Sequence, residues 1–152
     1  MTKHRVAAAL AAFSMLATVP TAAQAMTGAE KLRRLDIMLM VTGLRCRTGA
    51  DNFQADYARF TGVHLPALNA ASDSLKREMA TRHGAAGAVR ALDRLSVTMA
   101  NAYGQGHPWL NCRELKMVAR NLADVRGNEA LESAADQLLA ESGSAQMALL
   151  RR

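Results

Sequence analysis

The sequence predicts an all-α fold, a helical bundle of four to five helices around a central buried helix. Apolar side chains recur at intervals of three and four residues in five successive segments, which is the spacing of one helix face. No segment alternates apolar and polar residues with the β-branched character of a strand. Ala, Leu, Met, Arg and Glu are abundant, and all of them favour helices.

The central helix is predicted over residues 29–47. Thr27 and Glu30 fit a capping box, in which a hydroxyl and a carboxylate three residues later pair with backbone N–H groups. One face of this helix contains Leu32, Leu35, Leu39, Thr42 and Cys46. Residues 37–41 are apolar on every side, so the other helices are expected to surround this one.

A long second helix is predicted over residues 52–83. Pro66 lies inside it and has no N–H group to donate to the carbonyl of Gly62. A kink is therefore expected near residues 62–66. Two separate helices that meet at this point are the alternative.

Three shorter helices are predicted after a turn at residues 84–87. The third runs from about Val89 to Tyr103, the fourth ends before Gly127, and the fifth runs from a cap at Asn128 to Gly143. The segment 104–112 separates the third helix from the fourth and contains the only Trp of the chain. Proline suits the first turn of a helix, so the fourth helix begins either near Pro108 or just after Asn111.

The N-terminus has the three parts of a secretory signal peptide, namely a basic start, an uncharged apolar run over residues 6–19, and small residues at the cleavage point. Cleavage is expected after Ala25. Residues 1–25 are then the signal peptide, and residues 26–152 are a single helical domain with a loose tail from about residue 143. The predicted location is periplasmic or secreted. The apolar run is shorter than the roughly 20 residues of a spanning helix, so no stable membrane insertion is expected.

The charge of the chain gives little support for a nucleic-acid partner. Loss of Lys3 and Arg5 with the signal peptide lowers the formal net charge from +6 to +4. The remaining positive charge is spread along the helices and forms no basic run with interleaved aromatic residues. No nucleic-acid partner is therefore predicted.

The two cysteines of the chain, Cys46 and Cys112, predict one disulfide bond. Disulfides are typical of exported proteins, and a bridge between residues this far apart closes a long loop. The chain-entropy model assigns such a bridge about 4 kcal/mol of stability as an upper value. Two free thiols or a pair of metal ligands are the alternatives, but the sequence has no Cys-x-x-Cys motif.

The predicted bridge also suggests a candidate ligand-binding site. A disulfide holds its two Cα atoms about 6 Å apart, which brings Arg45, Arg47 and Arg113 close to the loop that contains His107 and Trp109. In one interpretation His107 is the functional side chain and the arginines contact an anion. In the other, His107 has a structural role or faces water, and Trp109 fills the core.

Motifs of known catalytic or cofactor sites are missing from the sequence. No nucleophile motif, phosphate-binding loop or dinucleotide fingerprint is present, and the histidines are scattered. No catalytic residue, metal site or cofactor is therefore predicted. His64 lies on the apolar face of the second helix, where a hydrogen-bonded core residue is expected.

Three segments carry a resemblance to known proteins, namely residues 39–47, 52–57 and 104–110. On these segments the chain resembles a group of small exported proteins of alphaproteobacteria, of the sphingomonad type. The resemblance extends over roughly residues 32–122. It implies no specific activity, substrate or cofactor.

These observations predict an exported, non-catalytic binding protein of the cell envelope whose partner is an envelope protein. The alternative is a small enzyme or a binder of a small anionic ligand that uses His107 with Arg45, Arg47 and Arg113. The apolar residues near the C-terminus (145–152) form a weak amphipathic segment, which gives a third hypothesis of association with a membrane surface.

Overall fold

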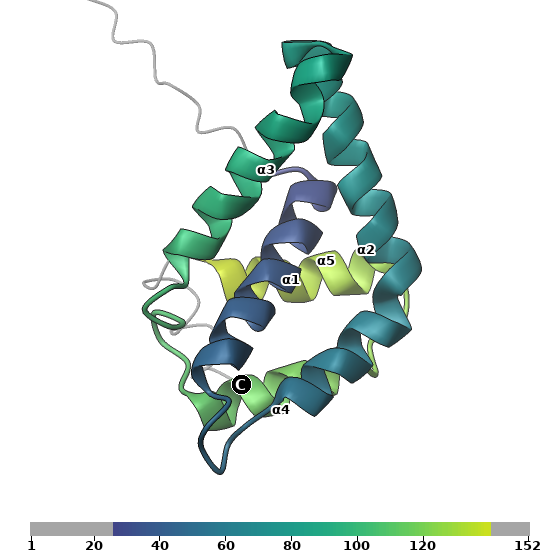
Figure 1. Cartoon of the computed structure of the whole chain (residues 1–152). Helices are drawn as coiled ribbons and strands as arrows, with labels where there is room; N and C mark the ends of the chain where they lie inside the picture. Colours follow the sequence, from purple (N-terminus) through teal and green to yellow (C-terminus); the bar gives the residue numbers. More distant parts are fainter. Residues whose placement is uncertain (1–25, 141–152) are drawn as a thin grey trace, which may run out of the picture.

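The computed structural model describes residues 26–140, and the predicted signal peptide and C-terminal tail lie outside this range. Its helices are α1 (Gly28–Arg45), α2 (Gln54–His83), α3 (Ala85–Ala102), α4 (Cys112–Leu122) and α5 (Asn128–Leu139) (Figure 1). No strand occurs within the described range. The all-α prediction is confirmed. None of these five helices is both long enough and apolar enough to cross a bilayer.

Helix α1 lies at the centre of the bundle, as predicted. Helices α2 and α3 form a long hairpin around it, α5 crosses behind it, and α4 lies near its C-terminal end (Figure 1). Helix α1 contacts all four of the other helices. Leu35, Met38 and Leu39 on α1 are completely buried. The expectation that residues 37–41 are covered on every side is only partly met, because Met40 is 40% exposed and Val41 is only partly buried.

The core continues from α1 onto both arms of the hairpin. The main cluster includes Phe53, Phe60, Leu115 and Leu131, and a smaller one lies farther along α2 and α3 around Met79. The apolar residues that mark the third helix in the sequence are Val89, Leu92, Leu95, Met99 and Tyr103, and all of them except Val89 are buried or partly buried. Val89 is 58% exposed, because the side chains that face α2 and α1 are those of Ala88, Ala91 and Met99.

Helix α2 is continuous through Pro66, so the alternative of two separate helices is wrong. It bends about halfway along its length (Figure 1). Pro66 and Gly62 are both exposed, so water can reach the carbonyl that the proline leaves without an amide partner. The bend therefore leaves no backbone carbonyl buried without a hydrogen-bond partner at this point, and its free-energy cost is small.

The starts of the helices confirm some predicted caps and correct others. The Thr27 hydroxyl accepts the Glu30 N–H at 3.2 Å, which is one of the two bonds of the capping box predicted for α1. Helix α4 begins after Asn111, and a reciprocal capping box decides this choice. The Asn111 side chain accepts the Glu114 N–H at 3.1 Å, and the Glu114 carboxylate accepts the Asn111 N–H at 2.8 Å.

Two glycines lie directly before a helix, where the sequence predicted a longer turn or a different cap. Gly84 alone separates α2 from α3, and Gly127 rather than Asn128 is the cap of α5. Both have positive φ, at 71° and 86°, a conformation that glycine adopts without steric cost. The chain passes from α2 to α3 at Gly84 alone, whereas residues 123–127 connect α4 to α5, and Asn128 is already helical. Helix α5 ends at Leu139, before the predicted stop at Gly143.

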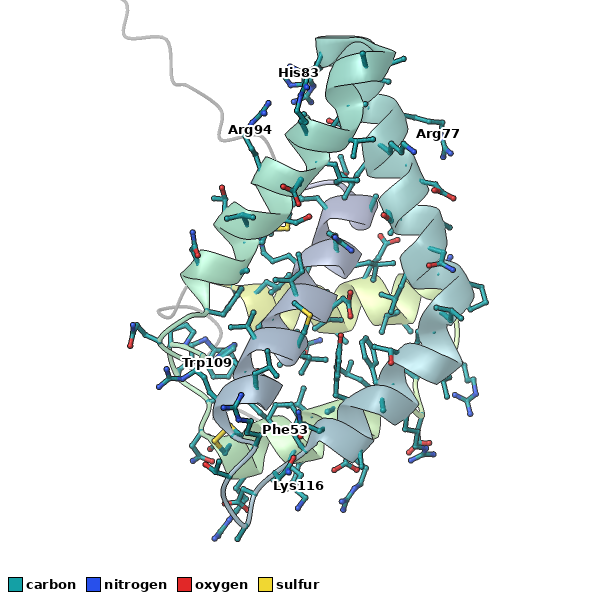
Figure 2. All side chains as sticks on the ribbon, in the orientation of Figure 1. Phe53, Arg77, His83, Arg94, Trp109 and Lys116 are labelled. Carbon is teal, nitrogen blue, oxygen red and sulfur yellow. A yellow bond between two sulfur atoms is a disulfide. The ribbon has the colours of Figure 1, made fainter. Side chains whose placement is uncertain are left out.

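The predicted disulfide between Cys46 and Cys112 is present, with Cα atoms 5.7 Å apart. Figure 2 shows it as a yellow sulfur–sulfur bond between the end of α1 and the start of α4. The bridge joins residues 66 positions apart and closes a loop that contains α2 and α3. It restricts the unfolded chain and holds α4 against the central helix.

Replacing both cysteines (Cys46→Ala with Cys112→Ala) is expected to lower the free energy of unfolding by about 2–4 kcal/mol, because the unfolded chain regains its loop entropy. Urea unfolding followed by circular dichroism measures this difference. Wild-type protein unfolded in the presence of a reductant is the control and should match the variant. An unchanged midpoint in both samples would contradict a stabilising role for the bridge.

Candidate functional site

His107 lies in the loop between α3 and α4 and is buried, with 9% of its surface exposed. Its Nδ1 accepts the backbone N–H groups of Trp109 and Leu110, at 3.4 and 3.2 Å. An amide N–H can only donate, so Nδ1 must be unprotonated and the proton of the neutral ring is on Nε2. Nε2 then donates to the carbonyl of Leu138, 3.0 Å away in the last turn of α5. Both ring nitrogens therefore have structural partners.

Two aromatic rings enclose the His107 imidazole. Tyr103 stacks on it with ring centroids 6.1 Å apart, and Trp109 meets it edge-on at 4.7 Å. Burial lowers the pKa of His107, while the Leu138 carbonyl and the Glu114 carboxylate act in the opposite direction and favour the charged form. The net direction is downward, so the ring is neutral at neutral pH.

The loop around His107 is held by backbone geometry and by α1. Gly106 has a φ of 109°, and its N–H donates to the Tyr103 carbonyl at 2.9 Å. Arg45 on α1 donates to the carbonyl of Gly104 at 2.9 Å. The two glycines of this segment therefore have different roles, because only Gly106 needs a conformation that other residues rarely adopt.

The disulfide brings the backbones of Arg45, Arg47 and Arg113 together, and the Arg45 side chain reaches the loop that contains His107. Arg45 and Arg47 line a shallow surface depression beside Val41 and Leu44. Arg113 points to the surface, where its Nε lies 3.9 Å from an Asp51 carboxylate oxygen.

His107 and Trp109 face a different part of the molecule. The His107 ring bonds to α5, and Trp109 lines a pocket that includes none of the three arginines. Arg45 and Arg47 therefore share one depression, while Trp109 lines another pocket.

Trp109 belongs instead to an apolar pocket between α4 and α5 that the sequence analysis missed. The pocket has a volume of about 350 Å³. Its lining consists of Trp109, Leu110, Val118, Asn121, Leu122, Val125, Ala134, Gln137 and Leu138. No charged residue is among them.

The pocket follows from how α4 and α5 pack. Helix α4 packs on α1 and α2, and α5 packs on α1, so the flanks of α4 and α5 meet each other less closely. Val118 and Ala134 lie on these flanks, beside the buried faces of their helices. In the sequence, Val118 and Ala134 are apolar although they lie beside the predicted buried face of their helices, and this pattern could have indicated the pocket.

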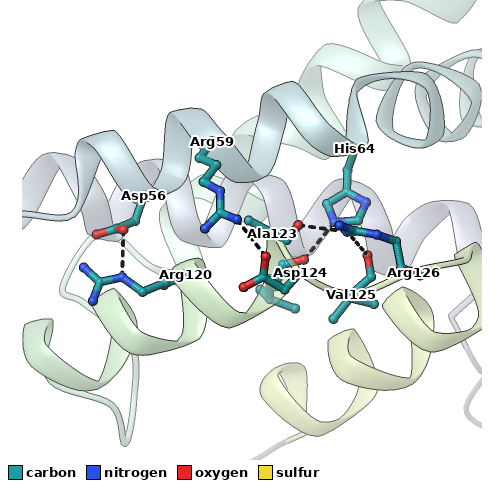
Figure 3. Close-up of polar contacts among 9 residues, drawn as sticks. Asp56, Arg59, His64, Arg120, Ala123, Asp124, Val125 and Arg126 are labelled. Atoms are coloured by element: carbon teal, nitrogen blue, oxygen red, sulfur yellow. Dashed lines mark hydrogen bonds and ion pairs between the residues drawn. The ribbon is translucent and has the colours of Figure 1, made fainter.

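His64 is a hydrogen-bonded core residue, as expected. Its Nε2 donates to the carbonyl of Leu122 at 2.8 Å, and its ring lies 5.2 Å from that of Phe60. Figure 3 shows this contact beside two ion pairs, Asp56 on α2 with Arg120 on α4 and Arg59 on α2 with Asp124 just after α4. Within the described range, no three His, Cys, Asp or Glu side chains are grouped as metal ligands.

Comparisons of the chain with protein-family models, with curated proteins and with solved structures found no match. The comparisons therefore supply no function to test against the geometry. The chemistry of the pocket and of the residues around it is the basis for a functional proposal.

Replacing Gly106 with Ala is expected to lower the free energy of unfolding by about 1–2 kcal/mol, because a side chain disfavours its positive φ. Gly104→Ala is the matched control in the same loop, since its φ is not positive, and should change stability by less than about 0.5 kcal/mol. Chemical unfolding of the two variants measures both values. Equal effects would show that the conformation of Gly106 carries no special strain.

Proposed function

We propose that this protein is an exported, non-catalytic binding protein whose α4–α5 pocket takes a small, uncharged hydrophobic ligand. The pocket itself is the observation that carries the proposal. Its volume of about 350 Å³ lies within the range of about 300–1,000 Å³ that is usual for small-molecule sites.

The lining of the pocket supports the class of ligand. A charged group that enters an apolar site without a counter-charge loses its hydration and gains nothing in return. The lining offers only the amides of Asn121 and Gln137 as exposed polar side chains. An apolar molecule with at most one or two neutral hydrogen-bonding groups fits these residues.

The state of His107 supports a role in binding rather than in catalysis. A general base needs a free ring nitrogen within reach of the substrate. In His107 the two nitrogens are engaged by three backbone groups, and burial keeps the ring neutral. Its position suits it to holding the walls of the pocket in place rather than to transferring a proton to or from a substrate.

Two features support export to the periplasm or beyond. The disulfide fits an oxidising compartment. The predicted signal peptide over residues 1–25 and the resemblance to small exported proteins of alphaproteobacteria favour the same location. An envelope protein as partner, predicted from the sequence, stays a prediction.

The uncharged fluorescent probe N-phenyl-1-naphthylamine is expected to bind saturably at pH 7.5 with one site per chain. Ala134→Leu places extra atoms in the pocket and should weaken binding at least tenfold, because the probe then loses its space. Titration followed by probe fluorescence measures the affinity, and emission of Trp109, the only Trp, reports contact with the pocket.

Ala130→Leu is the matched control, since Ala130 is exposed on the same helix one turn away and does not line this pocket. It should bind the probe like the wild type. Absence of saturable binding, or equal binding by Ala134→Leu and the wild type, would contradict the proposed function.

The depression beside Arg45 and Arg47 favours a second candidate function, binding of an amphiphilic anion. Neither arginine has an acidic partner within residues 26–140. Leu44, which lines the same depression, is 48% exposed. The arginines would contact the anionic head group, and the apolar side chains would contact the tail.

Arg47→Gln is expected to weaken binding of decyl phosphate about two- to fivefold at low ionic strength, the size typical of an exposed ion pair. Isothermal titration calorimetry measures this change. Arg94→Gln, which removes an exposed arginine on α3, is the control and should leave the affinity unchanged. Equal loss in both variants would indicate attraction by the overall positive charge and no site at Arg47.

A further inference from the structure

The three backbone groups that His107 contacts all belong to residues that line the α4–α5 pocket. Trp109 and Leu110 form its wall on the loop, and Leu138 forms part of its wall on α5. His107 bonds to the amides of the first two and to the carbonyl of the third. One imidazole ring therefore connects two walls of the same pocket, although His107 itself does not line it.

We propose that His107 is the positioning residue of this pocket and that protonation of its Nδ1 releases the loop wall, so that the ligand is held at neutral pH and released in mild acid. The proposal rests on the proposed function, since it assigns a means of regulation to the same pocket.

The chemistry of imidazole gives the reason. A neutral ring offers one donor and one acceptor, whereas a protonated ring offers two donors and no acceptor. A proton on Nδ1 would face the N–H groups of Trp109 and Leu110, so both of these hydrogen bonds would be lost. The bond from Nε2 to Leu138 survives, because Nε2 donates in either state. Protonation thus acts selectively on the wall formed by the loop.

The groups around His107 determine the pH range of this change. Glu114 from α4 favours the charged ring, whereas burial among Tyr103, Trp109 and α5 disfavours it more strongly. Arg34 on α1 interacts with Tyr103, and Arg45 on α1 lies close to Gly106, so positive charge approaches this loop from α1. On α5 the group that faces the ring is the Leu138 carbonyl.

The direction of the pH dependence follows from these contacts. The folded protein holds His107 neutral, with a pKa below its ordinary value, whereas the unfolded chain has the ordinary value. The stabilisation is complete above the ordinary pKa and is lost as the pH falls from there through the lowered pKa of the folded state. Ligand affinity is expected to fall over the same mildly acidic range.

Probe titrations at pH 7.5 and 5.0 test the proposal with three proteins. Loss of two hydrogen bonds should weaken binding of N-phenyl-1-naphthylamine by the wild type roughly tenfold at pH 5.0. His107→Gln keeps an acceptor and a donor but does not titrate, so it should bind at both pH values with little change. His107→Leu removes the bonds and should bind weakly at both.

A second readout uses the ligand-free protein. Quenching of Trp109 fluorescence by acrylamide, a neutral reagent, should increase between pH 7.5 and 5.0 in the wild type and stay constant in His107→Gln. Far-UV circular dichroism at each pH shows whether the helices are intact. His83→Gln, which changes an exposed histidine at the end of α2, is the control and should keep the pH dependence of the wild type.

The outcomes separate this inference from the function on which it rests. Binding at pH 7.5 that does not weaken at pH 5.0, or weakens equally in His107→Gln, overturns the role of His107 and leaves the pocket as a binding site. Absence of binding at pH 7.5 overturns the proposed function. In that case acrylamide quenching that is equal at both pH values also overturns the release of the loop wall.

Discussion

The burial of the apolar core face of α1 is the constraint on which the rest of the structure depends. Its side chains include Leu35, Met38 and Leu39, which are completely excluded from solvent and must be covered by other helices. The α2–α3 hairpin and α5 provide most of this cover, and the disulfide holds the start of α4 at the C-terminal end of α1. Because α4 and α5 both pack toward α1 rather than toward each other, an apolar pocket is left between them.

Each of the two buried histidines donates a hydrogen bond to a carbonyl group at the end of a helix. The last turns of α4 and α5 have carbonyl groups without a partner inside the helix, and such groups are costly when buried. His64 donates to Leu122 at the end of α4, and His107 donates to Leu138 at the end of α5. They differ on the other side of the ring, where only His107 accepts two backbone N–H groups of a loop. This difference is why the proposed control of the pocket involves His107.

The short backbone distance at the predicted site determines which residues are neighbours but not where their side chains point. The bridge places the Cα atoms of Cys46 and Cys112 5.7 Å apart, so the backbones of Arg45, Arg47 and Arg113 are near one another in space as expected. A side chain of an arginine is longer than this separation, and its direction depends on the exposed groups that it can reach. Arg45 therefore bonds to the loop and Arg113 approaches Asp51, while the ring of His107 turns inward to α5.

The sequence by itself determined the helical class, the central position of α1, the pairing of the cysteines and the structural role of His64. Each of these depends on periodicity or composition within one segment, or on there being a single possible partner. The tertiary structure decided that Ala88 rather than Val89 is buried on α3, the capping of α5 by Gly127, the bonds of His107 and the existence of the pocket. Periodicity describes the faces of one helix, whereas a pocket depends on the distance between two helices, and that distance is set by how each of them packs on a third.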